Sequence, residues 1–160
     1  MIDPDTLDAI RQKRELESTL SSLSEDIGPR ERRYFHLNSV ANLVYHFLEI
    51  REETDRIWVF DSLSQYLRDC REMLPGIDRD ASKRLYDQSL EKLVEFYHLQ
   101  LGFRLLMNRS VVYTFYAILL VLCYIFLNLY AVIALTTWFG YLTFMTFRRY
   151  RDRRVYSIFW

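Results

Sequence analysis

The sequence predicts an all-α membrane protein, with a cytosolic helical bundle of about four helices followed by a C-terminal two-helix transmembrane hairpin. Residues 110–147 form a stretch of 38 residues without a charged side chain. The chain has only four glycines and three prolines in 160 residues, which favours long helices with few turns. Upstream of residue 110, apolar residues recur at steps of three and four, as on one face of an amphipathic helix.

The first predicted helix begins at Asp3-Pro4, because aspartate is a good N-cap and proline fits the first helical position. Its apolar stripe ends at Gly28-Pro29, a pair that terminates helices. A second amphipathic pattern follows without a clear breaker. We therefore expect one continuous helix over residues 30–51.

The third predicted helix lies between the polar cluster at residues 51–55 and the breaker Pro75-Gly76. Asp78 then stands where it can cap a fourth helix. Between Asp78 and the uncharged segment, Gly102 is the only clear helix breaker. We therefore expect the fourth helix to continue into the membrane as a stalk.

The uncharged segment has the length of a membrane hairpin. As one helix it would extend about 57 Å, whereas a bilayer's hydrocarbon core is about 30 Å thick. Two short crossings fit, with a turn around residues 127–131. Arginines flank both ends, and positive charge is retained on the cytoplasmic side. The sequence thus predicts a multi-pass protein of the inner membrane with both termini in the cytoplasm.

The charge distribution separates three predicted regions. Residues 1–108 form the bundle and stalk, residues 109–147 form the hairpin, and residues 148–160 form a basic and aromatic tail at the cytosolic interface. Residues 1–109 carry 16 Lys or Arg against 20 Asp or Glu, which argues against broad nucleic-acid binding. The tail carries five Arg and one Asp, so its expected partner is the lipid bilayer. The predicted interface residues are Arg109, Arg148, Arg149, Arg151 and Trp160.

Small and polar residues within the hairpin are candidates for packing or for a pore. Thr136 and Gly140 form a small-xxx-small pair, and Thr143 falls on the same side. This face either packs against the first membrane helix or serves subunit packing and the lining of a pore. Asn128 belongs either to the turn or to a ring of amides at a pore mouth. We place Thr114, on the first membrane helix, in the same candidate set.

A second motif lies at residues 30–36, where Arg30 and His36 are separated by five residues. This spacing resembles the Arg-x(4–6)-His signature of HEPN ribonucleases, helical bundles that cleave RNA as dimers with this Arg and His at the scissile phosphate. Glu31 departs from the polar residue that many members carry there. The alternative is a solvated basic start of a helix. A single Glu-x-x-His pair, Glu95 and His98, is too few ligands for a di-iron bundle, so we expect no metal and no cofactor.

The motif at residues 30–36, the chain's size and the hairpin together resemble small bacterial antiviral membrane effectors. These include CRISPR-associated accessory proteins that join a HEPN-like bundle to membrane helices and oligomerise into pores. We therefore expect a homo-oligomeric membrane pore or permeabilising effector gated through its cytosolic domain. A membrane-anchored scaffold without pore activity is the alternative, and a HEPN-like ribonuclease is the third. The sequence does not identify a cytosolic protein or nucleotide-signal partner.

Overall fold

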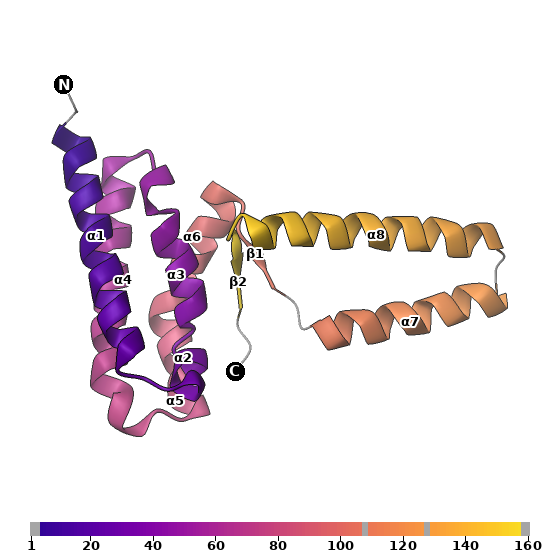
Figure 1. Cartoon of the computed structure of the whole chain (residues 1–160), viewed down its shortest axis with the longest axis horizontal. Helices are drawn as coiled ribbons and strands as arrows, with labels where there is room; N and C mark the ends of the chain where they lie inside the picture. The colour runs from indigo at the N-terminus through magenta and orange to yellow at the C-terminus, as the bar shows by residue number, and fades with distance from the viewer. Residues whose placement is uncertain (1–3, 107–108, 127–128, 158–160) are drawn as a thin grey trace.

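The computed structural model describes residues 4–106, 109–126 and 129–157, and they are nearly all helical, as predicted. Figure 1 shows a bundle of helices from which a two-helix arm projects crosswise. The elements in chain order are α1 (Pro4–Glu25), α2 (Pro29–Tyr34), α3 (Leu37–Tyr45), the 3-10 turn η1 (Phe47–Glu49), α4 (Glu53–Met73), the 3-10 turn η2 (Leu74–Gly76), α5 (Arg79–Leu85), the π-helical turn η3 (Tyr86–Leu90), α6 (Glu91–Leu101), β1 (Arg104–Leu105), α7 (Arg109–Phe126), α8 (Leu129–Arg151) and β2 (Val155–Tyr156).

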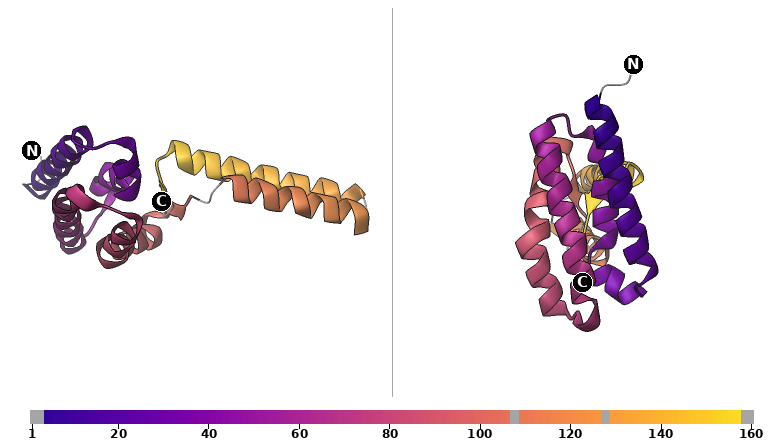
Figure 2. Two further views of the ribbon diagram at one scale, coloured as in Figure 1. Left: turned by 90° about the horizontal axis from the view of Figure 1, so that it is seen from below. Right: turned by 90° about the vertical axis from the view of Figure 1, so that its left-hand side faces the viewer.

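α1, α3, α4 and α6 all contribute buried side chains to an apolar core of the bundle. Figure 2 shows the bundle helices arranged around a common interior. The apolar stripes predicted for these helices turn inward, and burial of such faces supplies most of the stability of short helices. Its largest fully buried side chains are Tyr66, Tyr97, Phe35, Phe47, Phe103, Leu16, Leu23, Leu43, Leu63, Leu67, Leu90 and Leu93.

The expected continuous helix over residues 30–51 is wrong. The chain breaks after Tyr34, and His36 takes a left-handed conformation with φ of 48° before α3 begins. Two side chains from other helices stabilise this break, because they donate hydrogen bonds to the carbonyl groups that the break leaves without a helical partner. The Tyr66 hydroxyl donates to Phe35 O at 2.8 Å, and the Ser82 hydroxyl donates to Tyr34 O. These tertiary bonds satisfy backbone groups that a continuous helix would have paired internally.

The third predicted helix begins and ends close to the expected places, and the fourth begins where it was expected. α4 ends at Met73, directly before the 3-10 turn that contains Pro75 and Gly76. Asp78 caps α5, because its Oδ1 accepts the backbone N–H of Ala81 at 2.7 Å. The helix then passes through the π-helical turn η3, where Tyr86 and Leu90 are both buried, and continues as α6.

The predicted stalk is also wrong, because α6 stops at Gly102. This glycine has φ of 68°, a left-handed conformation that terminates helices, and its N–H donates to Tyr97 O. Phe103 then turns back into the core, where it is fully buried. The chain reaches α7 through the extended segment β1 instead of through a continuous helix.

α7 and α8 run side by side as a helical hairpin (Figure 2), held in part by the stacked rings of Tyr116 and Phe139, whose centroids are 3.7 Å apart. Among the described residues one helix, α8, is long and apolar enough to cross a membrane by length and composition, and residues 111–125 form a shorter apolar helix. Residues 129–131 of the predicted turn are already helical in α8, while residues 127 and 128 lie outside the described part.

Candidate functional site

The bundle and the hairpin are connected by two segments of the chain, and these segments pair with each other. β1 precedes α7 and β2 follows α8, yet they form a two-stranded parallel sheet with Arg104 opposite Val155. Arg104 N donates to Arg154 O at 3.1 Å, and Leu106 N donates to Tyr156 O at 2.7 Å. We call β1, residues 152–157 and the bundle residues that bind them the joint. Figure 1 shows it between the bundle and the arm.

The opposite edge of β2 is bound by side chains from α3. Asn42 Nδ2 donates to Val155 O at 2.8 Å, and Ser157 N donates to Ser39 Oγ at 2.9 Å. Ser39, Asn42 and His46 lie on one face of the helical path because they are three and four residues apart. This polar stripe is the sequence signal for the joint, but its partners lie more than a hundred residues further along the chain.

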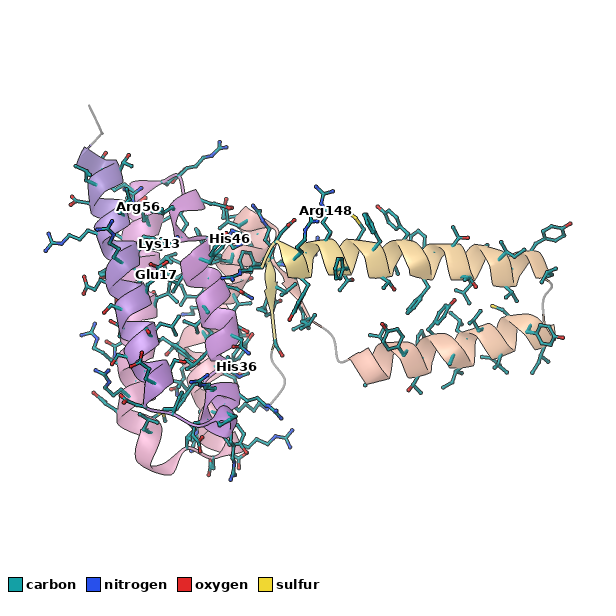
Figure 3. The ribbon with its side chains drawn as sticks, in the orientation of Figure 1. Lys13, Glu17, His36, His46, Arg56 and Arg148 are labelled. Carbon is teal, nitrogen blue, oxygen red and sulfur yellow. The ribbon has the colours of Figure 1, made fainter. Side chains whose placement is uncertain are left out.

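His46, at the end of α3, binds both the bundle and the end of the hairpin. The side chain is 5% exposed, and Figure 3 places it beside the C-terminal end of α8. Nε2 lies 2.9 Å from Asp152 O, and Nδ1 lies 2.8 Å from Glu49 Oε1. The edge of the ring also contacts Phe103, with centroids 5.4 Å apart.

Arg154 bridges two elements of the bundle from the tail. One guanidinium nitrogen donates to Leu101 O at 2.8 Å, at the end of α6, and another binds Glu49 Oε2 at 2.9 Å. The ion pair is partly exposed, so solvent screens it and its net stabilisation is modest. The Leu101 carbonyl is one of the orphan acceptors at a helix C-terminus, and Arg154 satisfies it.

The end of α8 is fixed by an unusual residue. Arg153 has φ of 55°, and Arg154 N donates to Arg149 O in a closing turn that glycine usually makes. The guanidinium of Arg153 lies over the Tyr45 ring, 4.8 Å from its centroid, which offsets part of the conformational cost. The tail predicted to lie in the membrane interface is therefore docked on the bundle over residues 152–157, and Val155 is buried there.

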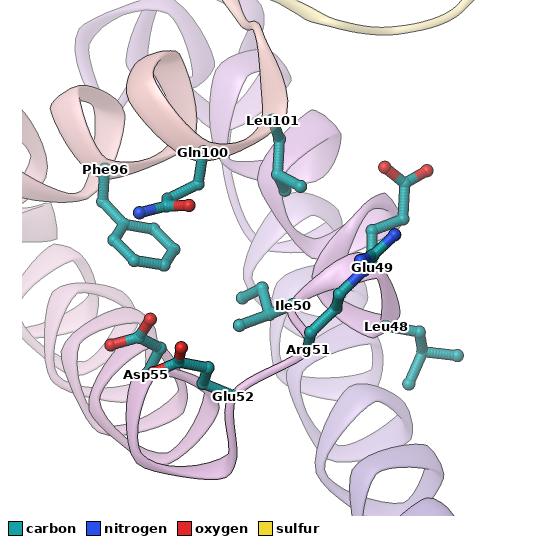
Figure 4. A pocket seen from close by; sticks show the side chains of 9 residues that line it. All are labelled: Leu48, Glu49, Ile50, Arg51, Glu52, Asp55, Phe96, Gln100 and Leu101. Carbon is teal, nitrogen blue, oxygen red and sulfur yellow. The ribbon is translucent and has the colours of Figure 1, made fainter.

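A groove of about 780 Å³ lies directly beside the joint (Figure 4). The sequence alone did not predict this groove. Glu49 belongs both to its wall and to the joint. Carboxylates and apolar side chains share the lining, which consists of Leu48, Glu49, Ile50, Arg51, Glu52, Asp55, Phe96, Gln100 and Leu101.

The ribonuclease-like pair is not brought into an open site. Arg30 is exposed on α2, where its guanidinium donates to the Tyr34 hydroxyl at 3.4 Å. His36 is 4% exposed, and burial lowers the pKa of its imidazole from 6.5 to about 4 despite a hydrogen bond with the Ser157 backbone. Its ring packs against Tyr86, with centroids 5.2 Å apart. A buried neutral imidazole is poorly placed to reach a phosphate in solvent.

The Thr136, Gly140 and Thr143 face points away from α7 and is exposed. The alternative that this face packs against the first membrane helix is therefore wrong, because α8 turns Leu135 and Phe139 to that side instead. A Cβ atom added at Gly140 meets nothing within 4 Å. Thr114 is likewise exposed on α7, and Asn128 lies outside the described residues.

The predicted interface residues gather where the hairpin meets the bundle. Arg148 and Arg151 are exposed in the last turn of α8, and Arg149 is half-buried beside them. α7 begins at Arg109, at the same end of the hairpin, and Trp160 lies outside the described residues. Figure 3 shows Arg148 near the joint.

Among the described residues, no group of three or more His, Cys, Asp or Glu side chains is arranged to hold a metal ion. His46 and Glu49 bind each other and the tail. His98 Nδ1 donates to Phe103 O at 2.6 Å.

No family model, curated protein or solved structure matches the chain. The class defined by the fold is thus a helical bundle that carries an apolar helical hairpin on a hydrogen-bonded joint.

Proposed function

We propose that the chain is a homo-oligomeric membrane pore or permeabilising effector whose α7–α8 hairpin crosses the inner membrane and whose cytosolic bundle controls it. The observation that carries the proposal is the joint. A passive anchor needs only a linker, whereas here both connections to the hairpin pair with each other and with α3. A displacement of the bundle would therefore move the ends of α7 and α8 together, as a gate requires.

The surface of the hairpin supports a membrane location. Large apolar side chains are exposed along both helices, including Phe115 and Phe144, and a soluble monomer rarely exposes so continuous an apolar surface. The 18 residues of α7 would extend about 27 Å, close to the thickness of the hydrocarbon core. The basic last turn of α8 lies on the side of the bundle, which supports a cytoplasmic bundle.

The outward face of α8 supports self-association. Thr136, Gly140 and Thr143 face away from α7, and small residues allow membrane helices to approach closely. A second copy of the hairpin is the partner that fits, since both surfaces would be uncharged and lined by small residues. The resemblance to antiviral membrane effectors adds defence against phage as the proposed setting.

The test compares two substitutions on different faces of α8. Gly140→Ile fills the outward face, and Ala134→Ile adds the same bulk on an exposed part of the helix outside that face. We expect Gly140→Ile to reduce the mass of the particle extracted in mild detergent and to abolish conductance in planar bilayers, while Ala134→Ile leaves both unchanged. Monomers without conductance in the unmodified protein would refute the pore.

The membrane-anchored scaffold remains the second candidate because of the hairpin's hydroxyl groups. Thr136, Thr137 and Thr146 each donate to the carbonyl four residues earlier in their own helix, at 2.8 to 2.9 Å. Their hydrogen-bonding needs are thus met in lipid without a partner or water. Replacing α7 and α8 by an unrelated apolar hairpin on the same joint separates the two, because a scaffold would keep its function and a pore would lose it.

A further inference from the structure

The ends of the hairpin nearest the bundle, residues 104–109 and 148–151, contain five arginines and no acidic residue. Arg154 brings the two ends together, because its N–H donates to Arg149 O at 3.0 Å and its carbonyl accepts the N–H of Arg104 at 3.1 Å. Three of the arginine side chains are exposed, and that of Arg149 is half-buried. We call the four arginines whose side chains the structure describes the collar: Arg104, Arg148, Arg149 and Arg151.

The collar differs from the next two arginines along the chain, which are bound to the bundle. Arg153 lies over an aromatic ring of α3, 4.8 Å from its centroid. Arg154 binds the Glu49 carboxylate at 2.9 Å. Among the described residues, the collar has one carboxylate within ion-pair distance, that of Asp152 at 3.8 Å from Arg151, and both side chains of that pair are exposed. The positive charge of the collar is therefore available to a ligand outside the chain.

The position of the collar on α8 matches the phosphate layer of a bilayer that the hairpin crosses. From Leu129 to Phe147 the helix is uncharged, and these 19 residues extend about 28 Å, close to the hydrocarbon core of about 30 Å. From Arg148 to Arg151 the helix rises a further distance of about 4.5 Å, and the headgroup layer is about 5 to 8 Å thick on each side. The guanidinium groups are thus placed among phosphates and not among acyl chains. Figure 3 shows Arg148 projecting from α8 next to the joint.

We infer that the collar binds the phosphates of anionic phospholipids in the cytoplasmic leaflet and holds the bundle against the membrane surface. This contact depends on the membrane crossing proposed above for the hairpin. A guanidinium group forms two parallel hydrogen bonds to a phosphate, which suits arginine to the contact. Phosphatidylglycerol carries a net negative charge, whereas the collar repels the choline ammonium of phosphatidylcholine. Anionic headgroups are therefore favoured.

A lipid fits this surface better than a soluble phosphate compound. The collar directly borders apolar surface, because Arg148 follows Phe147, a side chain that is 64% exposed. A phospholipid supplies a phosphate for the arginine and an acyl chain for the apolar surface beside it. A soluble anion would leave that apolar surface in water. Tyr150, which is also exposed, adds an aromatic ring at the level typical of membrane interfaces.

The decisive measurement is the composition of the lipids that the full chain retains. The protein is reconstituted in nanodiscs of equal parts phosphatidylglycerol and phosphatidylcholine and extracted in mild detergent, and its bound lipids are counted by native mass spectrometry. We expect about tenfold or greater retention of phosphatidylglycerol over phosphatidylcholine. Both faces of a nanodisc carry the same lipids, so the direction of insertion does not affect the result.

Two variants and a matched control assign the preference to the collar. Arg148→Gln combined with Arg151→Gln should reduce the preference by about tenfold, whereas lysine at both positions keeps the charge and should retain most of it. The control is Arg11→Gln combined with Arg14→Gln, which removes two exposed arginines with the same spacing from α1. α1 lies on the side of the bundle opposite the hairpin (Figure 1), so the control should leave the preference unchanged.

Four outcomes would overturn the lipid assignment. They are equal retention of the two lipids by the unmodified chain, an equal loss of preference in the α1 control, and a loss in the lysine variant as large as in the glutamine variant. The fourth is displacement of phosphatidylglycerol by inorganic phosphate but not by chloride at the same ionic strength, which would assign the collar to a soluble ligand. An inserted chain without lipid preference leaves the proposed pore intact, whereas a chain that stays soluble without lipid or detergent would refute the membrane crossing and the pore as well.

Discussion

Replacing Asn42 by alanine should loosen the joint while leaving the bundle folded. The Asn42 side chain donates to Val155 O at 2.8 Å and is the bond from α3 to the middle of β2. Alanine removes that donor and leaves a carbonyl acceptor of a buried residue unpaired. Asn42 is half-buried, so its truncation opens no cavity in the apolar core and global stability should change little.

The size of the effect follows from the hydrogen bond. A net hydrogen bond contributes about 1 kcal/mol, and an unpaired buried acceptor costs about 1 to 3 kcal/mol. A value near 1.4 kcal/mol corresponds to about a tenfold increase in the population of the opened joint. Water that reaches Val155 after opening would place the result toward the lower end of this range.

Hydrogen exchange of the Leu106 amide measures this opening, because that amide is bonded to Tyr156 O in the same sheet. The control is Asn38→Ala, which removes the same side chain from an exposed position of α3. We expect about tenfold faster exchange in Asn42→Ala and unchanged exchange in Asn38→Ala. Equal exchange in the two variants would show that α3 does not hold β2 in solution.

Three further outcomes test the bundle. Leu63→Ala, at a fully buried position, should lower the free energy of unfolding by about 2 to 5 kcal/mol in urea titrations, whereas Leu99→Ala, at a site 72% exposed, should change it by less than about 0.5 kcal/mol. Because burial lowers the pKa of His36 from 6.5 to about 4, its neutral form is favoured in the fold, and stability should fall as the pH drops through that interval. His36→Asn should weaken this pH dependence, because asparagine tolerates the left-handed backbone at this position. If stability falls equally with pH in the variant and in the unmodified protein, groups other than His36 cause the pH dependence. Burial raises the pKa of the Cys70 thiol to about 12, so alkylation followed by mass spectrometry should modify Cys70 only after unfolding; rapid modification of the folded chain would contradict its burial.

Local signals in the sequence were sufficient for much of the fold. The Asp78 cap and the Pro75-Gly76 breaker act within a few residues, so they predicted the boundary between α4 and α5. The uncharged segment likewise predicted two apolar helices, although their crossing of a membrane is a proposal. These features depend on the chain's own neighbours and not on tertiary contacts.

The break at His36 was missed because its cause lies elsewhere in the chain. Tyr66 and Ser82 are 31 and 48 residues from the carbonyls that they bind, and neither side chain signals such a role. The amphipathic pattern of residues 30–51 alone therefore predicted one continuous helix. Gly102 was recognised as a breaker, but its strength was underestimated, since burial of Phe103 also requires the chain to turn there.

The joint was not predictable because Asn42 and Val155 are 113 residues apart. Ser39, Asn42 and His46 are polar residues at helical spacing, which is typical of the side of an amphipathic helix that faces water. The tail read as basic and aromatic, which is typical of a membrane interface. Only the return of α8 to the bundle brings the two segments together.

The parallel pairing of β1 with β2 has a consequence for biosynthesis. β1 precedes the hairpin and β2 follows it, so in the proposed membrane topology their pairing requires both ends of the hairpin on the same side of the membrane. A copy in which one helix failed to cross would leave its tail on the far side, and α3 would expose unpaired polar side chains and an uncovered core edge. Because β2 is synthesised after both helices, completion of the bundle would report that the hairpin had inserted correctly. The joint would thus serve as a checkpoint on membrane topology.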